Sequence, residues 1–233
     1  MAVCIIRGNT PTITMRTDSR AFPRTGGDRR AQIGAVAVLA ASLALALVNL
    51  TTEVRVSAMR AILSAQQSEV EVAQPWLVDE RPSAALSPRA ALLRGMARTS
   101  AAVDELAPRR AALLASAAAD LDRTKGVRRW WADADVAESY RAMLAEGTRS
   151  PAALAALSRS YEAAPFLRGA APWRIRYGAT LWSDLPASTH ARIVAETVWL
   201  ARASGRTYGY ATGLVAGTPA EAPVDVLLAE TAS

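Results

Sequence analysis

Two tryptophans and three acidic residues lie close together near the middle of the chain. Trp130 and Trp131 are followed by Asp133, Asp135 and Glu138. Aromatic rings can stack on sugars while two carboxyl groups act as acid and base, so this cluster could serve a glycan-acting enzyme. The same residues also have a structural interpretation. Asp135 and Glu138 have the spacing of a capping box, Asp133 would lie beside the positive helix start, and Trp130 would cover the core, which leaves Trp131 for binding.

Other catalytic signals are weak. Glu138-Ser139 resembles the Glu-Ser pair of lytic transglycosylases, and the resemblance extends over these two residues. The single histidine, His190, lies on an apolar helical stripe and is expected to be a helix-end or core residue. There is no G-x-S-x-G or H-E-x-x-H motif. Cys4 is the only cysteine, so neither an intramolecular disulfide nor a cysteine-ligated zinc site can form. We therefore expect no catalytic residue, no cofactor and no metal.

An uncharged segment of 22 residues, Ala31 to Thr52, precedes all of these residues. As a helix rising about 1.5 Å per residue it would span roughly 33 Å, enough to cross a hydrocarbon core of about 30 Å. A cleavable signal usually has an apolar region of about 7–15 residues and small residues before the cut. Ala44-Leu45-Ala46 fits such a site but lies inside the apolar run. We favour an uncleaved anchor, with a cleaved signal as the alternative; the start could be Met1 or Met15.

The flanking charges predict the orientation of this anchor. Residues 1–30 carry a net charge of +4, whereas residues 53–233 carry +2. Because basic flanks stay in the cytoplasm, we expect a single-pass protein of a bacterial inner membrane with its C-terminal domain in the periplasm. Residues 53–233 show no basic stripe with interleaved aromatics, so we expect no nucleic-acid partner. Lys125 is the only lysine among 27 basic residues, which is typical of a GC-rich bacterial genome.

The pattern predicts four regions and an all-α fold. They are a basic tail (1–30), a transmembrane helix (31–52), a stalk with a proline-containing linker (53–86) and a helical domain (87–233). Helix starts are marked by Ser87-Pro88, by Ser150-Pro151 and by a capping box at Thr218–Glu221. We expect helices over 53–72, 87–106, 108–123, 133–146, 150–163, 172–183, 187–203, 206–216 and 219–230.

Two of these helices predict how the domain packs. The helix over 172–183 is apolar on two sides, with Tyr177 on one and Ile175 on the other, so it should be buried between two layers. In the helix over 187–203, Trp199 is expected on a polar face near Arg192 and Glu196. This favours stacked helical hairpins over a simple bundle.

One segment resembles a tetratricopeptide repeat. Leu154-x-x-Leu157-Ser158-x-x-Tyr161 is similar to the first helix of that repeat, with Ser158 where the family has glycine. The layout of basic tail, anchor and helical hairpins is also similar to membrane-anchored scaffold proteins of the bacterial envelope that serve surface-polysaccharide assembly. These resemblances imply a TPR-like domain or an irregular α-bundle.

Glycines recur at every fourth position near the C-terminus, at Gly205, Gly209, Gly213 and Gly217. Such a stripe would let another backbone approach closely, and we expect an intramolecular helix contact there, with a membrane-surface patch or a mobile loop as the alternatives. Aromatic and basic residues are candidates for partner binding: Trp131, Trp199, Arg192, Tyr208 and Tyr210. For Trp131 and Trp199, the alternative is burial against a neighbouring helix layer.

These observations favour a membrane-anchored helical scaffold or adaptor that binds other proteins, in cell-envelope or polysaccharide assembly. One alternative is a glycan-acting envelope enzyme that uses Trp130, Trp131, Asp135 and Glu138. A second alternative is an accessory subunit of a larger membrane complex, with a glycan as a further candidate partner.

Overall fold

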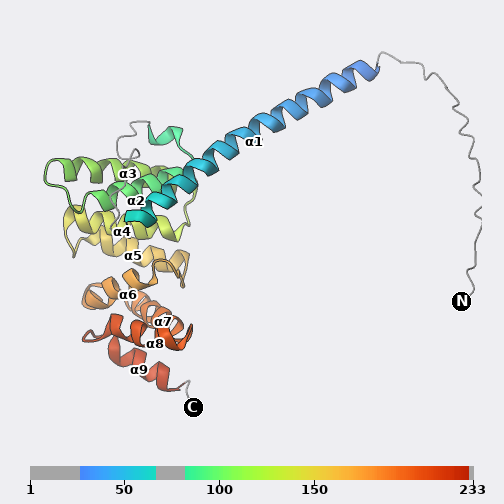
Figure 1. Ribbon diagram of the computed structural model, residues 1–233. Helices are drawn as coiled ribbons and strands as arrows, with labels where there is room; N and C mark the ends of the chain where they lie inside the picture. The colour runs from blue at the N-terminus through green and yellow to red at the C-terminus, as the bar shows by residue number, and fades with distance from the viewer. Residues whose placement is uncertain (1–26, 67–81, 231–233) are drawn as a thin grey trace, which may run out of the picture. The chain divides into compact units, whose positions relative to one another are not determined.

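The computed structural model describes residues 27–66 and 82–230, and all regular structure in these ranges is helical (Figure 1). No strand occurs there, which confirms the all-α prediction. Contacts divide the chain into two compact units, residues 1–48 and 49–233. Most of the predicted linker, up to residue 81, and the end of the predicted stalk helix fall in residues 67–81, and Cys4 and Met15 fall in the tail. All of these lie outside the described residues.

The first helix, α1 (Gly27–Gln66), contains the apolar segment. Its stretch Gln32–Thr51 is 20 residues long, is apolar enough to cross a membrane, and has none of its residues buried. Length and composition therefore agree with the predicted span.

The remaining helices follow the predicted ranges closely. Ser87 and Ser150 each accept a hydrogen bond from a backbone N–H of the following first turn, with proline at the start of the helix, as predicted. The eight helices of this part of the chain are α2 (Pro88–Ala101), α3 (Arg109–Val127), α4 (Ala132–Glu146), α5 (Pro151–Ala163), α6 (Ala171–Thr180), α7 (Ala187–Arg202), α8 (Gly205–Val215) and α9 (Glu221–Glu230).

The capping box predicted at Asp135 is wrong, and the one at Thr218–Glu221 forms in part, because Thr218 Oγ1 accepts from the backbone N–H of Ala220 at 3.3 Å. Helix α4 begins at Ala132, so Asp135 lies inside the helix and caps nothing. The Glu221 carboxylate accepts from the backbone N–H of Gly217 at 2.7 Å, one residue before the predicted partner. Gly217 has a φ of 71°, which requires glycine, so the helix start and its neighbouring turn form together.

Helices that follow one another in sequence pack on one another. Helix α2 packs along α3 and α4 packs along α5, while α3 also contacts α4. Helix α7 packs on α6, α8 and α9. Figure 1 shows α3 and α2 at one end of this unit and the labels α4 to α9 following one another toward the C-terminus.

The hydrophobic core is a series of four small clusters that share helices. Helix α2 contributes to the cluster around Val56 and, through Leu92, to the cluster around Leu121. Helix α4 joins the Leu121 cluster to a third one around Leu157. Helix α6 joins this third cluster to the last, around Val215. Each of α2, α4 and α6 is thus buried on two sides, and for α6 this confirms the prediction.

Buried ion pairs fix two of the helix contacts. Asp120 on α3 is fully buried and accepts from Arg94 Nη2 at 2.5 Å and from Arg98 Nη1 at 2.9 Å, both on α2. Glu196 on α7 is paired with the fully buried Arg174 on α6. A charged group that is removed from water needs such a partner, because an unpaired buried charge lowers the free energy of unfolding. Arginine here supplies forked pairs, so its abundance is not only a matter of genome composition.

Two glycines outside the predicted stripe make the close helix contacts. A Cβ added at Gly178 on α6 would lie 2.5 Å from Ile193 Cδ1 on α7. A Cβ at Gly95 on α2 would lie 3.2 Å from Leu121 on α3. Glycine at these two positions therefore allows the helices to approach each other.

Candidate functional site

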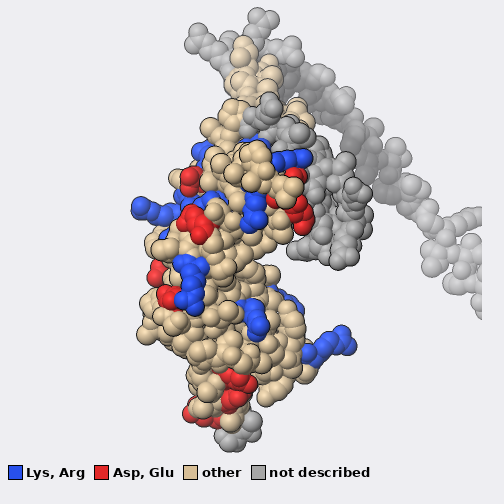
Figure 2. All heavy atoms as spheres, turned by 90° about the vertical axis from the view of Figure 1, so that its left-hand side faces the viewer, with Lys and Arg blue, Asp and Glu red and all other residues tan. Residues whose placement is uncertain are grey.

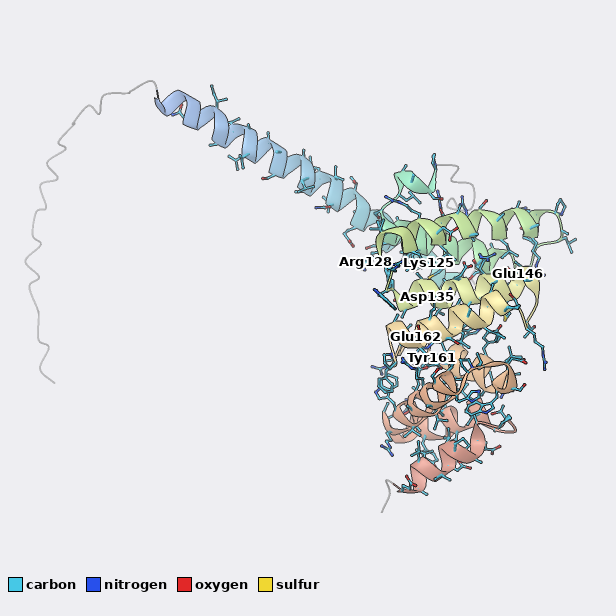
Figure 3. All side chains as sticks on the ribbon, turned by 180° about the vertical axis from the view of Figure 1, so that it is seen from behind. Lys125, Arg128, Asp135, Glu146, Tyr161 and Glu162 are labelled. Atoms are coloured by element: carbon cyan, nitrogen blue, oxygen red, sulfur yellow. The ribbon has the colours of Figure 1, made fainter. Side chains whose placement is uncertain are left out.

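A basic pocket lies between three helices, at the end of α3, the start of α4 and the second half of α5. Its volume is about 450 Å³, and it is lined by Lys125, Arg129, Trp130, Asp135 and Arg159. Helix α3 supplies Lys125, the loop before α4 supplies Arg129 and Trp130, α4 supplies Asp135, and α5 supplies Arg159. We call these five residues the basic pocket. Figure 3 shows the labelled Lys125 and Asp135 near each other at one end of the helix pair, with Glu146 at the other.

Asp135 is the buried acid of this pocket. Its side chain is 7% exposed, and one oxygen accepts from Arg159 Nε at 3.2 Å. Burial raises the pKa of Asp135 above its ordinary value, and the hydrogen bond and charge of Arg159 lower it only in part. Burial therefore disfavours the charged form of this carboxyl group, and the hydrogen bond from Arg159 offsets part of that effect.

Trp130 does not cover the core as predicted, and Trp131 is packed against a neighbouring helix layer, the alternative to its exposure. Trp130 is 75% exposed, whereas Trp131 packs against the cluster around Leu121. The indole Nε1 of Trp131 donates to Asp133 Oδ2 at 3.1 Å, and the guanidinium of Arg128 lies 5.0 Å from the ring centroid. Because α4 starts earlier than predicted, Trp131 becomes the residue at its N-cap and turns toward the core. Trp130 is left at the surface.

The remaining residues of the predicted glycan cluster have structural partners. Both carboxylate oxygens of Glu138 accept from Arg141, at 2.9 and 3.0 Å. The Ser139 hydroxyl is fully buried and donates to the carbonyl of Ala153 at 2.7 Å. Of the predicted cluster, only Trp130 and Asp135 line the basic pocket. The structure therefore does not bring Glu138 and Trp131 into the same site as Asp135.

Sequence reasoning missed three residues of the basic pocket, namely Lys125, Arg129 and Arg159. The run Lys125-Gly-Val-Arg-Arg-Trp-Trp places three cations next to two aromatics. This run could have been noticed as a local basic and aromatic signal, although its partner Arg159 comes from a different helix.

A second surface feature lies near the C-terminus. It is a mainly apolar groove of about 500 Å³, and we call it the C-terminal groove. Trp199 lines it from α7 and packs against Phe166, with the ring centroids 5.4 Å apart. Trp199 therefore sits half-buried in a groove and not on a polar face, and its predicted neighbour Glu196 is fully buried. The lining residues are Phe166, Ala195, Val198, Trp199, Arg202, Ala203 and Leu227.

The other candidates for partner binding differ in their availability. Tyr208 and Tyr210 on α8 are about half exposed, at 51% and 54%. Arg192 is half-buried, and its guanidinium donates to the backbone carbonyl of Tyr161. The two tyrosines are thus presented on the surface, whereas Arg192 is engaged within the domain.

The predicted close contact along the glycine stripe is wrong for the described part of the chain. A Cβ added at Gly205, Gly209, Gly213 or Gly217 would meet no atom within 4 Å. Helix α8 buries Ala211 and Val215 instead and turns its glycines to the surface. The stripe is therefore an exposed face.

His190 is a structural residue, as expected. Its ring stacks on Trp182 with centroids 4.0 Å apart, and its Nε2 lies 2.6 Å from the Trp182 carbonyl oxygen. Within residues 27–66 and 82–230, no group of three His, Cys, Asp or Glu side chains could hold a metal ion. On the face drawn in Figure 2, basic and acidic side chains are interspersed and do not form one stripe.

Comparisons with protein-family models, with curated proteins and with solved structures find no match to this chain. Functional inference therefore rests on the residues and their geometry.

Proposed function

We propose that this chain is a membrane-anchored helical scaffold or adaptor of a bacterial inner membrane. Its helical domain binds partner proteins during assembly of the cell envelope or its polysaccharides. The observation that carries the proposal is the apolar stretch Gln32–Thr51, of which no residue is buried. A lipid bilayer supplies the environment that these side chains lack in the protein.

The C-terminal groove supports the adaptor role. Partner-binding sites are commonly centred on aromatic residues in partly buried positions, and Trp199 and Phe166 have that arrangement here. The pairing of α2 with α3 and of α4 with α5 supports a TPR-like arrangement, whose stacked hairpins typically present binding surfaces. In the TPR-like segment, Leu157 and Tyr161 are both fully buried.

Photocrosslinking in the cells that naturally make the protein tests this proposal. A photoreactive amino acid replaces Phe166 in the full-length chain, and a matched variant carries it at Leu106, which is 84% exposed and outside the groove. We expect a discrete protein adduct from position 166 and none from position 106. Ala195→Trp, which fills the groove, should abolish the adduct, and so should removal of residues 1–52.

Three results would overturn the proposal. They are the absence of an adduct at position 166, an adduct that survives Ala195→Trp, and an adduct that forms equally well without the anchor. The first two would remove the groove as a partner site, and the third would remove the membrane from the mechanism.

A further inference from the structure

The basic pocket carries an excess of positive charge that its own acid does not balance. Lys125, Arg129 and Arg159 surround one carboxylate, that of Asp135. Lys125 is paired with Asp122 outside the pocket, at 3.4 Å, but that carboxylate is 74% exposed and is therefore largely screened by water. Among the described residues, no ion pair is formed by Arg129. The pocket is thus prepared to receive a negative charge.

Trp130 adds an apolar surface to these cations. Its side chain is 75% exposed, although tryptophan is among the largest apolar side chains and is usually covered. It lines the pocket together with the cations. An aromatic ring beside cations suits a ligand that has both a flat apolar face and a negative charge.

The volume of the pocket limits the size of such a ligand. At about 450 Å³ it falls within the range of sites that bind small molecules. It is too small to enclose a folded partner. A ligand of one or two ring units would fill it.

We propose that the basic pocket binds an acidic saccharide, meaning a sugar unit that carries a carboxylate or a phosphate. The ring of Trp130 stacks on the apolar face of the sugar, and Arg129 and Lys125 pair with its negative charge. Asp135 pairs with Arg159 at the pocket wall and is the one negative charge of the pocket that opposes such a ligand. This site is separate from the C-terminal groove, so it stands whether or not that groove binds proteins.

Calorimetric titration of the full-length chain in uncharged nanodiscs tests the proposal. The first pair of probes is a disaccharide of galacturonic acid and its methyl ester, which has the same sugar rings without the charge. The second pair is glucose 1-phosphate and glucose. We expect at least one charged probe to bind and its neutral counterpart to bind at least about tenfold more weakly, since tenfold corresponds to about 1.4 kcal/mol.

Substitutions assign the binding to the pocket. Trp130→Ala and Arg129→Gln should each weaken binding by about tenfold, and both side chains are exposed, so the fold should be unaffected. Leu106→Ala and Arg206→Gln are matched controls at exposed positions outside the pocket and should leave the affinity unchanged. Asp135→Asn should strengthen binding several-fold, because it removes the one negative charge of the pocket. A purely structural role of Asp135 would not produce that gain.

The opposite results would overturn the proposal. No binding of either charged probe, or equal binding of the neutral counterparts, would remove the acidic saccharide as ligand. Equal losses in Arg129→Gln and Arg206→Gln would show nonspecific attraction of charge. An oligothymidylate of the same charge that binds more tightly than both saccharide probes would identify the pocket as a nucleic-acid site instead.

Discussion

Arg174 and Glu196 form a fully buried ion pair that joins α6 to α7. Arg174 Nε lies 3.2 Å from Glu196 Oε2, and its second nitrogen pairs with the other oxygen. The guanidinium also donates to the carbonyls of Ser160 and Ala164, and its carbon lies 4.1 Å from the ring centroid of Tyr161. One arginine thus links α5, α6 and α7.

Glu196→Ala should destabilise the domain by about 3–5 kcal/mol, because it leaves a buried guanidinium without its counter-charge. Chemical denaturation of the full-length protein in detergent measures this loss. The exposed pair of Arg149 with Asp184, 3.5 Å apart, is a matched control. Asp184→Ala should cost no more than about 1 kcal/mol. Equal losses in the two variants would contradict the role given to burial.

Alanine should have opposite effects at two helical glycines. Gly178→Ala places a methyl group against Ile193, where overpacking costs about 1–3 kcal/mol. Gly209→Ala meets no atom within 4 Å and should stabilise α8 by about 0.5–1 kcal/mol. Thermal unfolding of both variants checks the sign of each effect.

A second substitution isolates the cause at Gly178. Ile193→Val removes the methyl group that the new Cβ would meet, so the double variant should be more stable than the sum of the two single changes predicts. Strict additivity would mean that the close contact between α6 and α7 is not what requires glycine.

Charge placed in the apolar stretch should release the protein from membranes. Arginine at the centre of a spanning helix costs about 2.5–3.5 kcal/mol, so Leu39→Arg combined with Leu43→Arg should prevent stable insertion. Carbonate extraction measures retention, with the corresponding double alanine variant as control. Retention of the arginine variant would rule out a spanning role for this helix.

Labelling of cysteine tests the predicted orientation of the protein in the membrane. A thiol reagent that cannot cross membranes should leave Cys4 unlabelled in intact spheroplasts and should label Arg206→Cys in a Cys4→Ser background. Arg206 is exposed on α8. The reverse labelling pattern would place the helical domain in the cytoplasm.

Asp135 should make stability depend on pH in a defined direction. Burial raises its folded-state pKa above the ordinary 3.8, so the folded chain binds this proton more tightly than the unfolded chain does. Its contribution to stability therefore falls as the pH rises through the window between the two values. Asp135→Asn removes this loss, so its melting temperature relative to the native chain should increase from about pH 4 to pH 7. Asp122→Asn, at an exposed acid, is the control, and a constant difference for Asp135→Asn would contradict the prediction.

Local sequence signals predicted most of the helices, whereas features that depend on contacts between distant residues could not be predicted. Ser87-Pro88 and Ser150-Pro151 mark helix starts because the cap is formed by residues adjacent in sequence. The spacing of Asp135 and Glu138 also fits a cap, but burial of Trp131 against α2 and α3 moves the helix start to Ala132. No local pattern contains that contact.

The glycines illustrate the same limit. A stripe at every fourth position indicates one face of a helix, yet it does not tell whether that face meets a neighbour or solvent. Gly178 has no such periodic partner and nevertheless makes the closest approach. The basic pocket likewise combines a visible run near Trp130 with Arg159, which comes from α5 and becomes a neighbour only after folding.

The series of four core clusters also determines how the domain should open. Neighbouring clusters are joined through shared helices: α2 joins the first two, α4 the next two, and α6 and α7 together join the last two. Local opening should begin at the C-terminal end of the series, where α9 packs on α7 and α8 and buries one of its residues, Val224, so its backbone amides should exchange with deuterium first. Amides of α4 and α6, which are held from both sides, should exchange last. A ligand that fastens α3 to α5 at the basic pocket would then slow exchange in the middle of the series and leave the fraying of α9 unchanged.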